Sequence, residues 1–360
     1  MLCCVRRHDK CKLGIYMDGK ELLLYALQNQ YLLEKGGRMD ILSGLCGLQA
    51  QFAGNPRYSL RIRAHDFSED GWSDGLLKIW THRNTIHVIR ADELGLFLSA
   101  KGDHGDWEEN WWGIPPRVKP YWSAFIREKV AEGIDGREAL KNACRGAGME
   151  ETLLKRIFHG WGGLIKEMSD RGMIAYHPGT EKRFLLPPEP AWMDRDEARL
   201  IILRRYFQNF GPATVEDCAS FTGFRLPEIR ALLRKGTLPL KSAECGGTSY
   251  YYLGELQASR SLPPCIYLSG FDQLVMGYRD RSRFLDPADK RLAVNQAGIV
   301  YPAILLHGRL CARWKKEKNK LLITPFHPLS LSDQRLAESG GRKLFHGEKL
   351  EVKFLPSCRP

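Results

Sequence analysis

The chain has 360 residues, enough for two or three domains whose cores need neither a metal nor a disulfide. Its 54 Lys and Arg residues outnumber its 42 Asp and Glu residues, giving a formal net charge of +12. This excess favours a polyanionic partner such as nucleic acid, because neutralised phosphates release counterions. The sequence has no apolar run of about eighteen residues and no signal-peptide pattern at its start, so we expect a cytoplasmic protein without membrane contact.

The ten cysteines are scattered along the chain. They form no Cys-x-x-Cys pair and have no paired histidines at zinc-site spacing, which predicts reduced thiols. Cys3, Cys4 and Cys11 lie among basic residues near the N-terminus. They either bind a metal or belong to a frayed end, and we favour the frayed end.

Residues 1–19 form an N-terminal extension, and the first structural unit is predicted over residues 20–115. Helical spacing of apolar residues, followed by a segment rich in β-branched and aromatic residues, predicts three helices and then a strand pair. These elements are expected over residues 21–33, 40–48, 58–63 and 80–89. Three helices followed by a hairpin is the order of a winged helix.

A second unit over residues 116–190 repeats this order, and such repetition indicates a tandem architecture. Its helices and hairpin strands are expected over residues 121–131, 136–144, 150–168, 173–176 and 183–186. The hairpin is a candidate wing. Pro187, Pro188 and Pro190 then form a linker, since a proline cluster continues neither a helix nor a central strand.

The third unit is predicted over residues 191–260. An apolar helical stripe ends at Gly211, Thr214 can cap the next helix, and Thr222 and Gly223 supply a tight turn. The helix that follows carries Arg225, Arg230 and Arg234. The pattern is typical of a DNA-binding helix-turn-helix, and the alternative is an ordinary pair of helices with surface arginines.

Residues 261–360 change to short apolar runs separated by turn residues, which predicts a C-terminal β-barrel or curled sheet followed by a tail. The expected fold is therefore α+β, with three tandem winged-helix units and a C-terminal β-barrel.

Several short motifs follow one another over roughly residues 20–331. They are Gly47-Leu-Gln-Ala-Gln51, Trp80 to His87, Phe210-Gly-Pro-Ala-Thr214, Phe271-Asp272, Gly277 to Arg281, His307 to Trp314, and Pro325-Phe326. In this order they resemble the motifs of the AlkZ/YcaQ family of winged-helix DNA glycosylases. The family's fold is three winged helices closed by a β-barrel.

The resemblance implies a catalytic Gln-x-Gln pair, which Gln49 and Gln51 match in the form of the AlkZ branch. Ala50 between them is smaller than the family's usual central residue. A W-x-x-R-x-T-x-H pattern nearby contributes candidate cleft residues. These are Trp80, Arg83, Thr85 and His87.

Glutamine is a poor general base, so the pair suits a substrate that needs little acid–base help. An N7-alkylated purine already carries a positive charge and leaves as a neutral base. Two amides can then orient water and place partial negative charge near the developing sugar cation. Residues two apart converge only in extended backbone, and the alternative is two solvent-facing amides at a helix end.

The other candidates each have two interpretations. Asp272 either supplies a cleft carboxylate or caps a turn and pairs with Arg279 or Arg281, and we favour the structural role. Arg279, Arg281 and Arg283 either contact phosphates or serve as surface charge. His82 and His87 either transfer protons or pack in the core, and we favour packing.

The predicted function is a monofunctional DNA glycosylase that hydrolyses the N-glycosidic bond of N7-alkylated purines, including bulky adducts or interstrand crosslinks. We expect double-stranded DNA with alkylated bases as substrate, a monomer without an obligate protein partner, and no metal or other cofactor. The main alternative is a non-catalytic winged-helix DNA-binding regulator, and a protein-interaction scaffold is a second.

Overall fold

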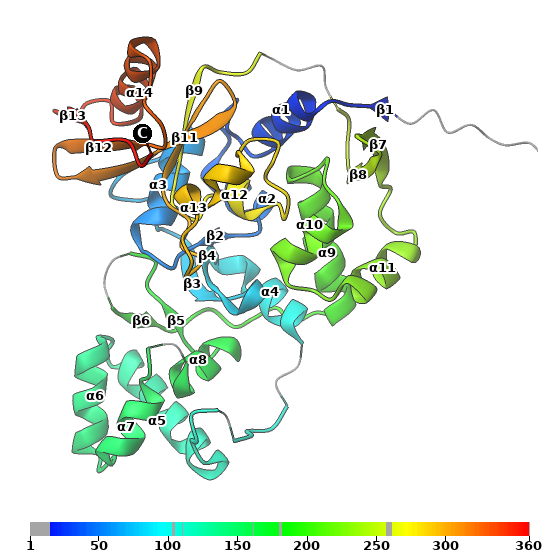
Figure 1. Ribbon diagram of the computed structural model, residues 1–360. Coiled ribbons are helices and arrows are strands. Elements are labelled where there is room, and N and C mark those ends of the chain that lie inside the picture. Colours follow the sequence, from blue (N-terminus) through cyan, green and yellow to red (C-terminus); the bar gives the residue numbers. More distant parts are fainter. Residues whose placement is uncertain are drawn as a thin grey trace, which may run out of the picture.

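The computed structural model describes residues 15–102, 105–109, 111–160, 162–179, 182–256 and 261–359. Runs of helices are followed by strand pairs or strand runs along the chain, and the described strands form three sheets (Figure 1). The protein is of the α+β class, as predicted. No helix in these ranges is both long and apolar enough to cross a membrane.

The first unit contains three helices and a strand pair, with one further strand and one further helix. Its elements are α1 (Gly19–Asn29), α2 (Arg38–Gly44), β2 (Leu48–Gln49), α3 (Gly54–Arg63), β3 (Leu76–Trp80), β4 (Ile86–Arg90) and α4 (Leu94–Lys101). The helix predicted to reach Leu48 ends at Gly44, because Cys46 and Gly47 have φ of 55° and 84°. A Cβ on Gly47 would lie 2.8 Å from the Ile89 side chain, so only glycine fits where the chain enters β2.

The second unit forms a separate lobe with its own apolar core (Figure 1). Its elements are α5 (Lys119–Ala131), α6 (Arg137–Gly146), α7 (Glu151–Ile157), α8 (Gly163–Asp170), β5 (Ala175–Tyr176) and β6 (Phe184–Leu185). The single helix predicted over residues 150–168 is wrong. Gly163 has φ of 71°, and a Cβ there would lie 2.2 Å from the Arg156 carbonyl oxygen, so the chain turns between α7 and α8.

The predicted wing of the second unit extends the sheet of the first unit. Strand β5 pairs with β3 through Tyr176 and Lys78, which gives the sheet order β2-β4-β3-β5-β6. The two units therefore meet along one sheet, and residues of both can line one pocket.

The third unit has the predicted order of three helices and a hairpin. It comprises α9 (Arg195–Asn209), α10 (Val215–Thr222), α11 (Leu226–Arg234), β7 (Lys241–Cys245) and β8 (Thr248–Tyr252). Thr214 and Asp217 form a capping box at α10, and Gly223 ends it with φ of 74°. Strand β1 (Ile15–Tyr16) pairs in parallel with β7, so the end of the predicted N-terminal extension belongs to this unit's sheet. The first and third units share one apolar core.

The C-terminal strands form an open sheet in the described part of the chain, where a closed barrel was expected. The elements are β9 (Cys265–Leu268), α12 (Gln273–Met276), α13 (Lys290–Ala293), β10 (Ala303–Leu306), β11 (Arg309–Glu317), β12 (Lys320–Pro325), α14 (Leu331–Leu344) and β13 (Glu351–Phe354). The strand order is β13-β12-β11-β10-β9, and no pairing joins the edge strands β9 and β13. Helix α14 packs on β9, where the Tyr267 hydroxyl donates to the Ala337 carbonyl at 2.7 Å. The helix buries the apolar face that closure would otherwise bury.

Candidate active site

Gln49 lies in a short strand at the edge of the sheet shared by the first two units. Strand β2 pairs antiparallel with β4, which places Gln49 opposite His87. The residue is 4% exposed, and its Oε1 accepts a hydrogen bond from Arg83 Nη2 at 3.1 Å. The strand ends at Gln49, and Gln49 is not among the described residues that line the pocket beside Gln51.

Arg83 connects this strand to the third unit. It lies in the turn between β3 and β4 with φ of 55°, a left-handed conformation that is uncommon for a side chain of this size. Its guanidinium donates to the Phe221 carbonyl of α10 and lies 5.2 Å from the Phe221 ring centre. Burial lowers the pKa of Arg83 to about 10, so it stays charged at neutral pH and can hold Gln49 in place.

Gln51 has a different environment from Gln49. It lies in a bend after β2, and its Oε1 is buried without a hydrogen-bond partner. The side chain lines a pocket of about 360 Å³, whose wall also includes Ala50 and Trp80. An unpaired buried acceptor is unfavourable, so this oxygen would gain from a hydrogen bond to water or a ligand.

Aromatic side chains from the first two units line the same pocket. Trp80 ends β3, and its Nε1 donates to the hydroxyl of Tyr176 at 3.3 Å. Phe184 completes this aromatic wall, with its ring 5.2 Å from that of Tyr176. Burial raises the pKa of Tyr176 to about 12, so its phenol is protonated at neutral pH. Of the predicted cleft residues, Trp80 is the one that lines this pocket.

His82 and His87 form a buried pair whose ring centres are 4.2 Å apart. His87 Nδ1 lies 2.8 Å from Thr81 Oγ1, and the Thr85 hydroxyl donates to the His82 carbonyl at 3.3 Å within the turn. Burial lowers the pKa of His87 to about 3 and that of His82 well below its usual value. Both rings are therefore neutral near pH 7, which favours the packing role over proton transfer.

Asp272 is fully enclosed and faces away from solvent. It is 1% exposed, caps α12 and accepts from Leu274 N at 3.0 Å. Its carboxylate forms two hydrogen bonds with Arg63 of α3, at 2.7 and 2.9 Å. The partner is thus Arg63 rather than Arg279 or Arg281. This closed pair argues against a cleft carboxylate and for the structural role.

The three arginines after α12 differ in exposure. Arg279 is exposed, whereas Arg281 is partly buried and its Nε donates to the Val275 carbonyl at 2.7 Å. The side chain of Arg283 is only 6% exposed and lies 4.1 Å from the Tyr278 ring centre. Arg283 is therefore a packing residue and is badly placed for a phosphate contact.

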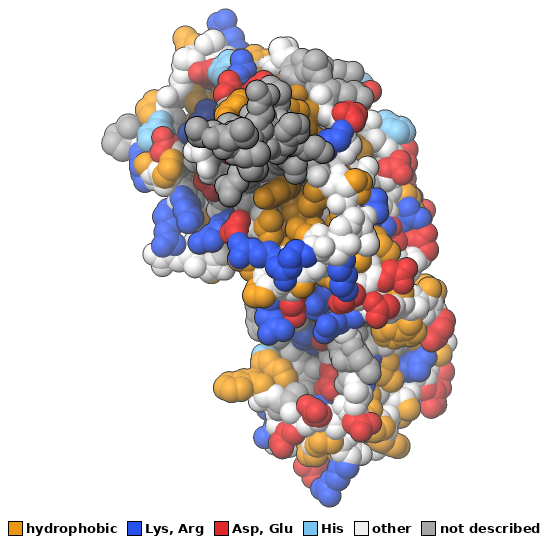
Figure 2. All heavy atoms as spheres, turned by 90° about the vertical axis from the view of Figure 1, so that its right-hand side faces the viewer, with side chains coloured by type: hydrophobic (Ala, Val, Ile, Leu, Met, Phe, Trp, Pro, Cys, Tyr) orange, Lys and Arg blue, Asp and Glu red, His pale blue; other side chains and the backbone are white. Residues whose placement is uncertain are grey.

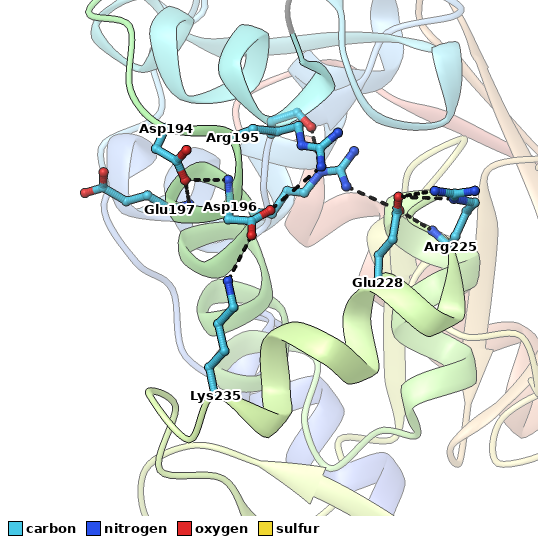
Figure 3. Close-up of polar contacts among 9 residues, drawn as sticks. Asp194, Arg195, Asp196, Glu197, Arg225, Glu228 and Lys235 are labelled. Carbon is cyan, nitrogen blue, oxygen red and sulfur yellow. Dashed lines mark hydrogen bonds and ion pairs between the residues drawn. The ribbon is translucent and has the colours of Figure 1, made fainter.

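The predicted recognition helix carries its arginines on the surface. Arg225 forms an ion pair with Glu228, and its side chain is 81% exposed. Arg230 forms an ion pair with Glu216, and its side chain is 54% exposed. Arg234 is also exposed. Figure 3 shows Arg225 at the start of α11 and Lys235 beyond its end, where Lys235 binds Asp196 at 2.9 Å. Figure 2 shows the side of the molecule on which α10, α11 and the β7–β8 hairpin lie in Figure 1, with Lys and Arg side chains gathered across its middle. Exposed pairs of this kind are weak and leave the arginines able to exchange their partners for phosphates.

No cluster of three or more potential metal ligands from His, Cys, Asp and Glu occurs within the described ranges. The seven cysteines in these ranges are all free thiols. Cys3, Cys4 and Cys11 lie outside the described residues.

Sequence reasoning missed the residues that the second unit contributes to the pocket. Arg137, Tyr176, Lys182 and Arg183 line it together with Lys78 of β3. Their proximity depends on the pairing of β5 with β3, and no motif in the sequence signals that pairing.

Comparison with known proteins agrees with this fold. Residues 42–343 match the family described as DNA glycosylase AlkZ-like. The interstrand DNA cross-link repair glycosylase of Streptomyces sahachiroi is 26% identical over 339 residues, which cover 85% of this chain and 90% of that protein. The solved structure of the Streptomyces sahachiroi DNA glycosylase AlkZ has a TM-score of 0.76 at 22% identity, covering 95% of this chain and 100% of that chain.

The family match, over most of the chain, defines the protein as a DNA glycosylase. It belongs to the AlkZ-like DNA glycosylase family.

Proposed function

We propose that this glycosylase is monofunctional and hydrolyses the N-glycosidic bond of N7-alkylated purines in double-stranded DNA. The observation that supports this substrate class most directly is the composition of the pocket beside Gln51. Gln51 lines this pocket and its amide oxygen is buried without a hydrogen-bond partner, and none of the lining residues that the structure describes is acidic. Without a carboxylate to protonate the base or deprotonate water, the site suits a base that leaves unaided.

The two glutamines would divide the work. The Oε1 of Gln51 accepts a hydrogen bond from the attacking water and places partial negative charge near the developing sugar cation. The Oε1 of Gln49 accepts from Arg83 instead, so Gln49 would contribute by holding the strand that precedes Gln51. A preorganised dipole of this kind contributes about 3–4 kcal/mol to transition-state stabilisation.

We propose that the three helix-and-hairpin units act as winged helices on the duplex. Exposed arginines of α11 and Arg279 would contact phosphates, which orients the protein without reading base sequence. Bulky N7 adducts and interstrand crosslinks are proposed as substrates because N7 adducts project into the major groove and because the relative from Streptomyces sahachiroi is named a cross-link repair glycosylase. We propose that no cofactor takes part.

The direct test is release of N7-methylguanine from methylated duplex DNA by the purified chain, with a parallel assay on an N7-linked interstrand crosslink. Release from methylated DNA supports the proposed substrate class, and release from the crosslink extends it to bulky lesions. Absence of release from both substrates, combined with sequence-selective binding of undamaged DNA, would contradict the proposal and favour the regulator.

A further inference from the structure

We propose that the pocket beside Gln51 binds a backbone phosphate of the strand that carries the lesion, and that the second unit supplies most of its ligands. This inference rests on the proposed function, because it places the phosphodiester next to the sugar that Gln51 serves. In this arrangement the basic side chains of the pocket contact the phosphate, and the aromatic wall contacts the nucleoside.

All charged residues in the described part of the pocket lining are cationic. There are four of them, and they come from β3, from the start of α6 and from the segment that leads into β6. The residues are Lys78, Arg137, Lys182 and Arg183. A cationic cluster of this kind attracts an anion, and phosphate is the anion that DNA presents.

Three of the cations are held in place by contacts at the pocket wall. Lys78 Nζ donates to the Gly179 carbonyl at 3.3 Å, and Arg137 donates to the Phe158 carbonyl. Arg183 pairs with Asp135, with its Nε 3.0 Å from the carboxylate oxygens. Lys78 and Arg137 each have further N–H donors, so a phosphate can bind to them without displacing these anchors. Lys182 is exposed and forms no ion pair with the described residues.

A cationic lesion base would bind poorly beside the same four cationic side chains. An N7-alkylated purine and the sugar cation formed from it are both positive, so four nearby cations would repel them in the absence of DNA phosphate. A bound phosphodiester neutralises the cluster and adds negative charge beside the reacting sugar. The aromatic wall formed by Trp80 and Tyr176 then offers an apolar face to the nucleoside. The pocket therefore suits a nucleotide with its phosphate toward the second unit.

The experiment measures binding of the full chain to a duplex that contains a tetrahydrofuran abasic-site analogue, by fluorescence anisotropy over a range of salt concentrations. This probe needs no catalysis. The slope of log K against log salt is negative, and each lost phosphate contact reduces its absolute value by about 0.9. We expect K182Q and R183Q each to reduce the absolute value of the slope by about this amount. The control K155Q removes an exposed charge on α7, outside the pocket, and we expect it to leave the slope unchanged.

Unchanged slopes for both K182Q and R183Q would overturn the phosphate site. Faster release of N7-methylguanine by K182Q at saturating enzyme, with an unchanged slope, would also overturn it, because that result places the base next to the cations. Release by the unmodified chain is measured separately. If the salt dependence of binding weakens in K182Q and R183Q but the unmodified chain releases no N7-methylguanine, the phosphate site is supported and the proposed function is contradicted.

Discussion

Arg83 donates a hydrogen bond to the side-chain oxygen of Gln49 at 3.1 Å, across the sheet edge formed by β2 and the turn between β3 and β4. Two residues later, the corresponding oxygen of Gln51 is buried without a partner. The two glutamines of the motif therefore have different environments: the side-chain oxygen of Gln49 has a protein partner, whereas Gln51 lines the pocket and its oxygen has none.

We expect replacement of each glutamine with leucine to have different effects on the free energy of unfolding. Gln49→Leu leaves a buried donor of Arg83 unpaired, which lowers the free energy of unfolding by about 1–3 kcal/mol. Gln51→Leu removes an oxygen that already lacks a partner, so we expect stability to be unchanged or slightly higher. Urea denaturation of both variants checks this difference. Equal destabilisation by the two substitutions would contradict the assignment of a held and an available amide.

The buried pair of Arg63 and Asp272 predicts a structural phenotype for Asp272. Asp272→Asn leaves Arg63 without its counter-charge and lowers the free energy of unfolding by about 3–5 kcal/mol. The double variant Arg63→Met, Asp272→Leu removes both charges, and we expect it to recover part of this loss. Glycosylase activity per folded molecule is expected to stay near that of the unmodified chain in both variants. A large loss of activity in a fully folded Asp272→Asn variant would instead place the carboxylate in the chemistry.

Local patterns predicted the helices and hairpins well where one face of an element is apolar. The third unit is the clearest case, because Thr214 and Gly223 mark the ends of α10 in the sequence as they do in the structure. Helix α4 was missed because all of its residues from Leu94 to Ala100 are buried, which erases the amphipathic period. The break between α7 and α8 was missed because it depends on the positive φ of Gly163 and its close approach to Arg156.

The candidate site was predictable only in its local part. The motif around Gln49 and Gln51 and the extended backbone that it needs are visible in the sequence. The hydrogen bond from Arg63 to Asp272 spans 209 residues, and the pairing of Tyr176 with Lys78 depends on how two units pack. Such contacts are set by tertiary packing, so neither the closed environment of Asp272 nor the basic pocket could be predicted from residue spacing.

The buried histidines predict loss of stability in acid. In the folded chain the pKa of His87 is about 3, below its ordinary value of 6.5, and the pKa of His82 is also well below that value. The folded state therefore binds fewer protons than the unfolded state, and the free energy of unfolding falls as pH decreases from 6.5 toward 3. Each histidine contributes a slope of up to about 1.4 kcal/mol per pH unit.

Removing one titrating ring should reduce this dependence. His82→Phe keeps an aromatic ring in the core and deletes one imidazole, so the pH slope of unfolding should decrease by up to about 1.4 kcal/mol per unit. Urea titrations at several pH values across this range measure the slope. An unchanged slope in His82→Phe would show that other groups cause the acid sensitivity.

Gln273 is predicted to position the loop that carries the glutamine pair. Its Nε2 donates to the carbonyl of Gly47, directly before β2. Gln273→Leu frees this loop, and we expect the single-turnover rate constant to fall about ten- to a hundredfold while affinity for abasic-site DNA is retained. Gln334→Leu is the matched control, because Gln334 of α14 donates a similar bond to the carbonyl of Leu329, just before that helix, at 3.1 Å. Equal effects of the two substitutions would argue that Gln273 acts only on stability.

The most direct test of the account is single-turnover release of N7-methylguanine by the unmodified chain and by Gln51→Ala, with DNA binding measured for both. Gln208→Ala is the control, since Gln208 is an exposed glutamine on α9. We predict that release by Gln51→Ala falls about a hundredfold or more while binding and the Gln208→Ala rate are preserved. Release by Gln51→Ala at the full rate of the unmodified chain would contradict the claim that the unpaired amide of Gln51 directs the hydrolysis.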